Sequence, residues 1–276
     1  MSLKSSEKKN ISSRIFHVNT AGCRFRIKSV HPHVDKRKGN RPNLIFLHEG
    51  LGCIELWRDF PEILCLSTDC SGFVYDRIGY GESEPFEDAW PLDYLEKEAL
   101  RYLPALLKTC DITDVILIGH SDGGTIALIA ASIYNHLVRG IITEAAHIFV
   151  EDITLSGIRN AVKDFESTSL KEKLARYHKE NTEMIFYRWV NRWLSTEFYN
   201  WNIEEYLPKI TCPVLALQGE DDEYGTPAQI EGIANLVSGP VYPVLIPKCG
   251  HVPHFQAKRK VLYEMTRFIK SCHDFI

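Results

Sequence analysis

The stretch 117–128, "LIGHSDGGTIAL", changes character twice. An apolar run ends at Gly119, a small polar segment follows, and apolar residues with helical spacing then begin. This order predicts a buried strand, a sharp turn that carries Ser121, and a helix that starts directly after the turn. Gly119 and Gly123 flank the serine, because such a turn is strained and needs small neighbours. The stretch fits the pattern G-x-S-x-G, which exposes a serine hydroxyl at the end of a strand.

The serine predicts two partners further along the chain. A serine hydroxyl is a poor nucleophile without a base, and the base needs an acid to orient it. The segment "PVLALQGEDDEYGTP" (213–227) begins with an apolar run, and Asp221 and Asp222 follow that run. The segment "VLIPKCGHVPHF" (244–255) contains the end of the next apolar run, and His251 follows it. The order serine, aspartate, histidine along the chain is the one that this strand–turn–helix motif requires.

The rest of the chain predicts an α/β fold. Short runs that are apolar at nearly every position suit strands buried on both faces of a parallel sheet, and they lie at 43–48, 72–76, 114–119, 138–143, 213–219 and 241–247. Segments with three- and four-residue apolar spacing alternate with them, which places helices on both faces of a mostly parallel central sheet. Before these runs, residues 14–19 and 23–30 alternate like the two strands of a hairpin.

One stretch breaks the alternation of strands and helices. Residues 150–206 hold no strand-like run and consist of charged, aromatic-rich helical segments. We interpret them as a helical cap inserted into one core, which comprises residues 14–149 and 207–276. In such sheets ligands bind beyond the carboxyl ends of the strands, where the insertion would cover them. Residues 1–13 are polar and lysine-rich, and we expect a disordered lead there.

Composition excludes several classes of function. The net charge is -4 without a long run of one sign, so nucleic acid is not an expected partner. The longest apolar runs are far too short for a membrane span. The eight cysteines show no CxxC or zinc spacing, and we expect reduced thiols in a cytoplasmic protein. The pair His251 and His254 lacks a third ligand nearby, so no metal and no cofactor are expected. The expected partner is a small-molecule substrate, and the sequence does not determine the oligomeric state.

Five segments together resemble the α/β-hydrolase superfamily: "HEGLG" (48–52), "YDRIGYGES" (75–83), "GHSDGG" (119–124), "GEDDEYGTP" (219–227) and "CGHVPHF" (249–255). The capped serine hydrolases look most similar, including esterases, meta-cleavage-product hydrolases and cofactor-free haloperoxidases. The resemblance implies the α/β-hydrolase fold and a catalytic triad of Ser121, Asp222 and His251. In that family the acid stands three residues after the glycine that ends the strand, which selects Asp222 over Asp221.

The resemblance also implies an oxyanion hole and a structural loop. The N–H groups of Gly50 and Asp122 are the expected oxyanion donors, and "YDRIGYGES" (75–83) is expected to have no catalytic role. The family loop usually reads His-Gly-x-Gly or His-Gly-x-Pro, whereas here Glu49 follows His48. Two alternatives stay open for Glu49: it faces solvent or pairs with an arginine, or it points inward and opposes an oxyanion.

Further residues are candidates for the pocket. We expect Trp57, His147 and Trp189 to contact the substrate, because aromatic side chains near the reacting groups suit an apolar ligand. Glu144 is a second candidate for the triad acid. His254 is expected to be structural.

The predicted function is that of a serine hydrolase. It would cleave a carboxylic ester, thioester or lactone of a small, apolar substrate through an acyl-enzyme on Ser121. The same triad could instead serve a C–C bond hydrolase, a perhydrolase or a lyase, and sequence does not separate these. A non-catalytic ligand receptor is a further alternative. Epoxide hydrolases and haloalkane dehalogenases are disfavoured, because those relatives use an aspartate where Ser121 stands.

Overall fold

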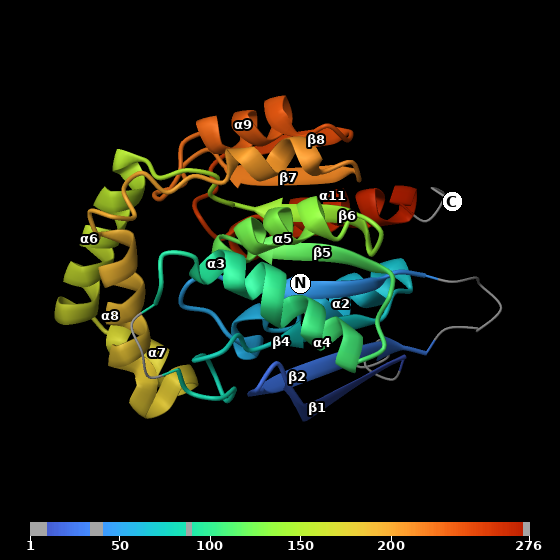
Figure 1. Ribbon diagram of the computed structural model, residues 1–276, viewed down its shortest axis with the longest axis horizontal. Helices are drawn as coiled ribbons and strands as arrows, with labels where there is room; N and C mark the ends of the chain where they lie inside the picture. The colour runs from blue at the N-terminus through green and yellow to red at the C-terminus, as the bar shows by residue number, and fades with distance from the viewer. Residues whose placement is uncertain (1–9, 34–40, 87–89, 273–276) are drawn as a thin grey trace.

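The computed structural model describes residues 10–33, 41–86 and 90–272, and within them eight strands form one sheet (Figure 1). The order across the sheet is β1-β2-β4-β3-β5-β6-β7-β8. Neighbours from β4 to β8 are parallel, whereas β1 and β2 form an antiparallel hairpin that joins β4. The strands are β1 (Ile11–Thr20), β2 (Cys23–Pro32), β3 (Asn43–Leu47), β4 (Gly72–Tyr75), β5 (Val115–His120), β6 (Val138–Glu144), β7 (Val214–Gly219) and β8 (Val241–Ile246). The predicted mostly parallel sheet is confirmed.

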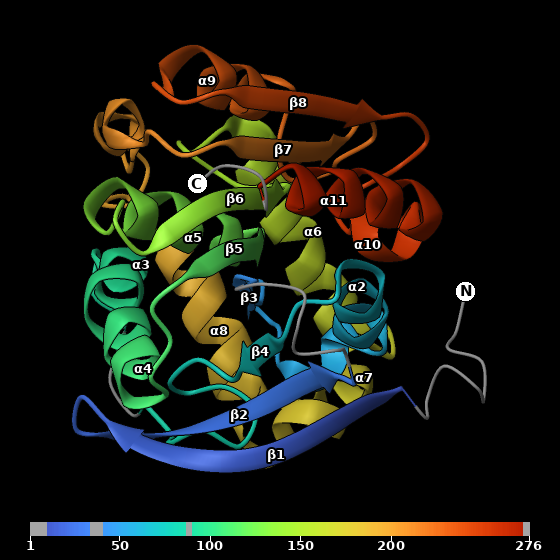
Figure 2. The same cartoon turned by 90° about the vertical axis from the view of Figure 1, so that its right-hand side faces the viewer.

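Helices cover both faces of this sheet (Figure 2). One face carries α3 (Tyr94–Lys97), α4 (Leu103–Thr109), α5 (Asp122–Ile133) and α9 (Ala228–Leu236), with a π-helical turn at Glu98–Tyr102 between α3 and α4. The other face carries α2 (Phe60–Thr68) and α11 (Lys258–Cys272), preceded by the short α10 (Pro253–Gln256). None of the helices in the described residues is long and apolar enough to cross a bilayer.

Successive side chains of the apolar strands pack into two separate hydrophobic cores, one on each face of the sheet. In β3, Ile45 and Leu47 pack into the cluster beneath α5, whereas Leu44 and Phe46 pack into the cluster beneath α2 and α11. Successive side chains of a strand point to opposite faces, so a strand that is apolar at every position is buried on both. This explains why the inner strands could be predicted from their apolar runs.

Strand β8 departs from that expectation. Its side chains Tyr242 and Leu245 are 49% and 39% exposed. The physical reason is its place at the end of the sheet, where β7 is its only neighbour among the described strands. The apolar run at 241–247 therefore predicted the strand correctly, but the expectation that helices bury both of its faces is wrong.

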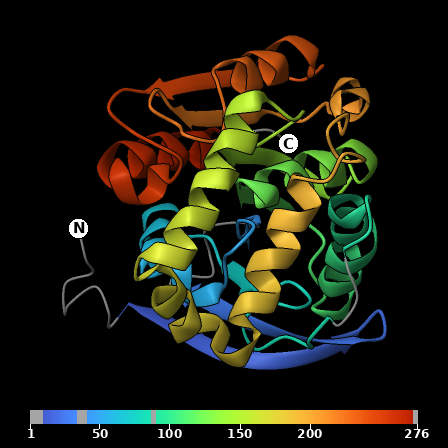
Figure 3. The same ribbon diagram turned by 90° about the vertical axis from the view of Figure 1, so that its left-hand side faces the viewer.

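The helices between β6 and β7 form a group of their own (Figures 1 and 3). They are α6 (Asp152–Ser167), α7 (Leu170–His178) and α8 (Thr182–Trp193), with 3-10 turns at Lys179–Asn181 and Glu204–Lys209. We call α6, α7 and α8 the cap helices. The chain leaves the core and returns to it at one point, because Phe149 forms an antiparallel bridge with Asn202 and Ile203 N donates to Ile148 O over 2.8 Å.

The amino-terminal prediction needs a correction. Residues 11–13, which we expected in a disordered lead, are the first residues of β1 and pair with residues 30–32 of β2. Alternation was not evident in "ISS", so the sequence did not mark them as strand. The remainder of the predicted lead, residues 1–9, lies outside the described residues.

Candidate active site

Ser121 occupies a strained turn between β5 and α5. Its backbone has φ 52° and ψ -117°, and residues other than glycine rarely adopt a positive φ. The turn is held from both sides, because Ser121 N donates to Glu144 O over 2.8 Å and Gly124 N donates to Ser121 O over 2.8 Å. Its side chain is thereby fixed at the carboxyl end of the parallel strands, directly at the N-terminus of a helix.

The flanking glycines are required by close backbone approach. A Cβ atom on Gly119 would lie 2.0 Å from Gly123 O, and a Cβ atom on Gly123 would lie 2.0 Å from Leu47 O. Real Cβ atoms do not approach oxygen so closely, and the atoms in the way are backbone atoms that cannot rotate aside. The tight packing of β5, α5 and β3 therefore allows only glycine at these two positions.

We expect Gly123→Ala to destabilise the fold by about 3 kcal/mol, because overpacking against fixed backbone must move α5 or β3. Thermal denaturation of the purified variant would measure the loss. Gly232→Ala in α9 is the matched control, since the nearest atom to its new Cβ is the tip of the Ile148 side chain, which can rotate. Equal melting temperatures for the two variants would contradict the close approach around Gly123.

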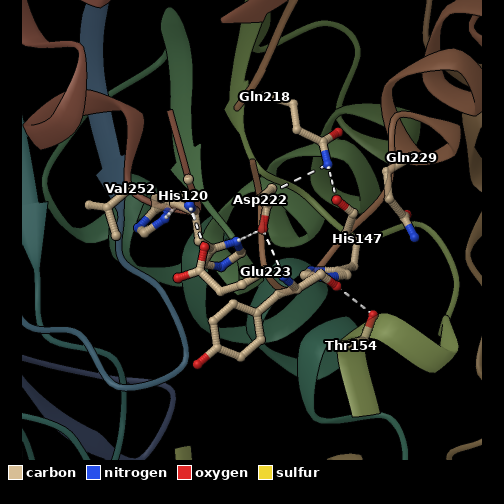
Figure 4. Close-up of polar contacts among 12 residues, drawn as sticks. His120, His147, Thr154, Gln218, Asp222, Glu223, Gln229 and Val252 are labelled. Carbon is tan, nitrogen blue, oxygen red and sulfur yellow. Dashed lines mark hydrogen bonds and ion pairs between the residues drawn. The ribbon is translucent and has the colours of Figure 1, made fainter. Parts of the chain in front are cut away.

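His251 and Asp222 form a buried pair beside this turn. His251 Nδ1 lies 2.8 Å from Asp222 Oδ1, and the same oxygen accepts a hydrogen bond from Tyr224 N at 2.9 Å. Gln218 Nε2 approaches the other oxygen of Asp222 at 3.5 Å (Figure 4). Burial alone would raise the pKa of Asp222, but the hydrogen bond and charge of His251 outweigh burial and lower it. Asp222 is thus an ionised carboxylate that fixes Nδ1 as the protonated nitrogen and leaves Nε2 as the basic one.

Nearby groups fix the backbone of His251. Glu223 Oε2 accepts a hydrogen bond from His251 N at 3.1 Å, and His120 Nε2 donates to His251 O over 2.7 Å. Among the described residues, no direct hydrogen bond joins Ser121 Oγ to His251, although both side chains line the same cavity. Catalytic hydrogen bonds are often long in proteins without substrate and shorten when substrate binds.

Glu144 does not take the place of Asp222. Its carboxylate Oε2 lies 2.5 Å from His254 Nδ1, and both side chains are buried. His254 in turn stacks on Trp57, with ring centroids 4.8 Å apart. The alternative in which Glu144 serves as the triad acid is therefore wrong in this arrangement, and His254 has the structural surroundings that we expected.

Trp57 does not reach the cavity, so its predicted substrate contact is wrong. It is 2% exposed and packs against Phe46 in the core beneath α2 and α11. The reason is the 3-10 turn at Ile54–Trp57, which directs the chain inward directly after the "HEGLG" loop. Position in the sequence placed Trp57 near that loop but could not show which face of the turn it occupies.

The loop 48–52 is held by His48 and Arg77. His48 Nδ1 donates to Glu49 O over 2.7 Å, and its Nε2 accepts from Arg77 N at 3.1 Å. The Arg77 guanidinium donates to Glu49 O over 2.8 Å and to Asp122 Oδ2 over 3.2 Å. Arg77 is buried and joins this loop to the start of α5. It positions both segments; the resemblance implied a structural loop at 75–83 but not these contacts.

Gly50 and Asp122 lie side by side at the cavity wall next to Ser121. Asp122 is the first residue of α5, so its N–H has no acceptor within the helix. The N–H of Gly50 shares its peptide with Glu49 O, and the bonds from His48 and Arg77 to that oxygen fix the orientation of the peptide. The role of both N–H groups as oxyanion donors stays a prediction.

Glu49, the departure from the family loop, faces His120. Its Oε2 lies 3.5 Å from His120 Nδ1, an ion-pair distance. Burial would lower the pKa of His120, but Glu49 outweighs burial and raises it; reciprocally, His120 lowers the pKa of Glu49 against the effect of burial. Because His120 also binds His251 O, Glu49 connects the loop 48–52 to the loop that carries the histidine. Glu49 lines the cavity that holds Ser121, which favours the inward alternative, but neither alternative anticipated His120 as its partner.

We expect Glu49→Gln to lower the free energy of unfolding by about 2 kcal/mol near pH 6, because it removes the charge that stabilises protonated His120. A raised histidine pKa stabilises the fold fully below the unfolded value of 6.5, and a lowered glutamate pKa does so above 4.5. The difference from wild type should therefore be largest between these values. It should shrink as the pH rises through the folded pKa of His120 or falls through that of Glu49.

Urea denaturation at pH 5.5, 7.5 and 9 would measure this dependence. Glu172→Gln, at an exposed position of α7, is the control and should change stability by less than about 0.5 kcal/mol at each pH. A loss in Glu49→Gln that stays constant from pH 5.5 to 9 would show that no ion pair with His120 exists.

The cavity at these residues has a volume of about 240 Å³. Its floor contains Ser121 and His251, and the cap helices supply Thr154 and Ile158 from α6 and Trp189 and Trp193 from α8. The acidic residues among its lining are Glu49, Asp122 and Glu223, and no lysine or arginine of the described chain lines it. The predicted residues Trp189 and His147 both lie here. Tyr224, which the sequence analysis missed, directly follows the acidic loop and could have been found from that position.

One group of side chains elsewhere has the spacing of a metal site. Ligand atoms of Cys53, Glu55 and Asp76 lie within 4.8 Å of one another. Arg26 already pairs with Glu55 at 2.6 Å and with Asp76 at 3.3 Å, and Ile54 N donates to Asp76 over 2.7 Å. Burial, aided by Asp76 and Glu55, raises the pKa of the Cys53 thiol, which keeps it protonated. These donors satisfy the group without a metal.

Comparison with known proteins gives consistent matches. The model of the "Alpha/beta hydrolase family" matches residues 44–262. Serine hydrolase BPHL of Homo sapiens is 32% identical over 214 residues, which cover 75% of this chain and 72% of that protein. A serine hydrolase involved in carbazole degradation has a TM-score of 0.72 at 18% identity, covering 94% of this chain and 99% of that one. The enol-lactonase from Burkholderia xenovorans has a TM-score of 0.69 at 17% identity, covering 92% and 100%. The two structural likenesses support the fold.

Proposed function

Because the chain belongs to the alpha/beta hydrolase family, we propose that it is a serine hydrolase of small, neutral carboxylic esters, thioesters or lactones. The observation that carries this proposal is the imidazole of His251, which is hydrogen-bonded to the buried Asp222 and lines the same cavity as the strained Ser121. A serine at such a turn beside an oriented imidazole is the arrangement that nucleophilic acyl transfer requires.

The proposed reaction has two halves, acylation of Ser121 and hydrolysis of the acyl-enzyme, and His251 acts as base in both. His251 Nε2 takes the proton of Ser121 as Oγ attacks the carbonyl carbon, and Asp222 stabilises the resulting imidazolium. The N–H groups of Gly50 and Asp122 bind the oxyanion, and removal of one such donor would cost about 3 kcal/mol in the transition state. The imidazolium returns its proton to the leaving alcohol or thiol. Water, activated by His251, then releases the acid from Ser121.

The cavity supports a restricted range of substrates. A volume of about 240 Å³ suits a short acyl or alcohol group, and the tryptophans Trp189 and Trp193 offer apolar walls. The carboxylates of Glu49 and Glu223 would repel an anionic substrate, and no lysine or arginine of the described residues lines the cavity, whereas the carboxylate of Asp122 is buried against Arg77. Paired esters with and without a carboxylate group would test the preference, which should favour the neutral ester.

A serine-reactive probe tests the proposal directly. Wild type incubated with a fluorophosphonate should gain the mass of one adduct, and His251→Ala should react far more slowly because it lacks the base. A panel of esters, thioesters, lactones and C–C bond substrates would then identify the bond that is cleaved. A folded wild-type protein that gains no adduct would contradict the proposal and favour a non-catalytic receptor.

A further inference from the structure

Residues 49–52 form a turn within the loop 48–52, and this turn carries the expected oxyanion donor, the N–H of Gly50. Gly52 N closes the turn by donating to Glu49 O over 3.1 Å. Three side chains from other segments donate to its carbonyl oxygens: Arg77 to Glu49 O over 2.8 Å, Tyr80 to Gly50 O over 2.8 Å, and His178 to Leu51 O over 2.9 Å. Arg77 and Tyr80 belong to the core, whereas His178 is the last residue of the cap helix α7.

Both ring nitrogens of His178 are used. Leu51 O only accepts hydrogen bonds, so Nε2 of His178 carries the hydrogen, and Nδ1 is free to accept from Gly81 N at 3.4 Å. The side chain is 1% exposed, and burial lowers the pKa of His178, which favours the neutral ring that makes both bonds. His178 does not line the cavity around Ser121. Any effect of His178 on the reaction therefore passes through the segments that it holds.

The bond to Leu51 O reaches the N–H of Gly50 through successive peptide groups. Leu51 O and Gly52 N belong to one planar peptide group, so fixing the oxygen also fixes the direction of the N–H. That N–H donates to Glu49 O, which shares the preceding peptide group with the N–H of Gly50. Oxyanion donors stabilise a transition state because they are held in place before the reaction. His178 thus fixes the end of the turn opposite to the donor.

We infer that His178 is a positioning residue of the acyl-transfer reaction, through which cap helix α7 orients the oxyanion donor of the core. The inference rests on the proposed function and adds a cap residue to its machinery. It divides the contribution of the cap helices in two. Trp189 and Trp193 form walls of the cavity and act on the bound ester, whereas His178 acts on the transition state.

A purely structural role for His178 leads to a different expectation. Other bonds fasten the cap helices to the core: Thr154 Oγ1 donates to Tyr224 O over 2.6 Å, and Trp193 Nε1 donates to Tyr94 Oη over 3.1 Å. If His178 only added to this fastening, its loss would loosen the walls of the cavity. Binding of the ester would then weaken as much as the reaction slows.

Three measurements on His178→Ala separate these roles. Hydrolysis of 4-nitrophenyl butanoate should show kcat lowered about 30-fold, since a displaced oxyanion donor weakens transition-state binding. Calorimetry with benzyl butanoate in the Ser121→Ala protein, with and without His178→Ala, should give dissociation constants within about twofold of each other. The third measurement is inhibition by 1,1,1-trifluoro-4-phenylbutan-2-one.

This ketone reports on the oxyanion donors directly. Ser121 Oγ bonds to its carbonyl carbon, the serine proton passes to His251, and the carbonyl oxygen becomes an oxyanion. The inhibition constant should therefore rise about 30-fold in His178→Ala, in parallel with the loss in kcat.

Two conservative replacements separate the nitrogens of His178. His178→Gln keeps an N–H at the reach of Nε2 and should restore kcat to within about threefold of wild type. His178→Asn keeps an acceptor at the reach of Nδ1 but is too short for Leu51 O, so it should lose as much as His178→Ala. Melting temperatures establish which variants are folded. If His178→Ala is unfolded, the comparison of His178→Gln with His178→Asn decides.

Lys179→Gln is the matched control. It alters the next residue and removes a bond of 2.9 Å from Lys179 Nζ to Glu82 Oε1, which also joins the cap to the loop 75–83. Both side chains of this pair are largely exposed, and neither touches the turn 49–52. The variant should keep kcat and the inhibition constant within about twofold of wild type.

The inference is overturned if folded His178→Ala keeps kcat within twofold of wild type, if ester affinity falls as much as kcat, or if His178→Gln and His178→Asn lose equally. Failure of the proposed function has a different signature, namely a folded wild-type protein that gains no fluorophosphonate adduct. That outcome would remove the reaction itself and overturn this inference with it.

Discussion

Ser121→Ala is expected to lower kcat by about a million-fold, since the acyl-enzyme cannot form without the hydroxyl. The replacement also removes the atom that a fluorophosphonate would modify in this cavity. Hydrolysis of 4-nitrophenyl butanoate, followed by absorbance, and intact mass after labelling would measure both losses. The strained backbone is kept in the variant, so the fold should remain intact.

Ser132→Ala is the matched control for this loss. Ser132 lies on the same helix α5, is buried, and donates to Ile129 O over 2.7 Å, away from the cavity. Its replacement should leave the rate of hydrolysis within about twofold of wild type, since it touches none of the reacting groups. Hydrolysis by Ser121→Ala above 1% of the wild-type rate would refute nucleophilic attack by Ser121.

Asp222→Asn is expected to lower kcat by about 10,000-fold with little change in structure. The carboxylate accepts from His251 Nδ1 and from Tyr224 N, whereas an amide in its place would favour the wrong tautomer of His251. The basic nitrogen of the imidazole would then face the introduced amide instead of the serine. Steady-state kinetics from pH 6 to 9 would measure the loss.

The neighbouring aspartate provides a closely matched comparison. Asp221 is exposed, and its backbone N–H donates to Cys249 O. Asp221→Asn changes the net charge as Asp222→Asn does, and it should leave kcat within about twofold of wild type. Equal losses in both variants would mean that the loss follows the charge of the loop and not the contact with His251.

The sequence was most informative where local chemistry dictates structure. The inner strands were predicted because β3 and β5 are apolar at almost every position. Such a composition is typical of a strand that is buried on both faces of the sheet. The turn at Ser121 was predicted because glycines flank the serine, and a Cβ atom at either glycine would lie 2.0 Å from a backbone oxygen. His251 and the pair Asp221 and Asp222 were predicted from their positions after successive strands, and the family resemblance selected Asp222, which lies 2.8 Å from His251.

The sequence was least informative where contacts join distant segments. Glu49 and His120 stand far apart in the chain, and nothing in either segment marks the other as a partner. Trp57 was misplaced because spacing along a short turn does not show which face is buried. The contact between His147 Nε2 and Tyr224 O could not be predicted either, because backbone carbonyls carry no residue identity that a sequence could display.

The bridge between Phe149 and Asn202 has a consequence for modularity. A segment whose two ends are already in contact can be shortened, lengthened or exchanged at small entropic cost. Strands β6 and β7 pair directly, so the sheet does not need the intervening segment to close. The cap helices supply Trp189 and Trp193 to the cavity, whereas Ser121, Asp222 and His251 come from the core. Much of the apolar wall can therefore be transplanted between homologous scaffolds as one continuous piece, with the reacting groups left in place.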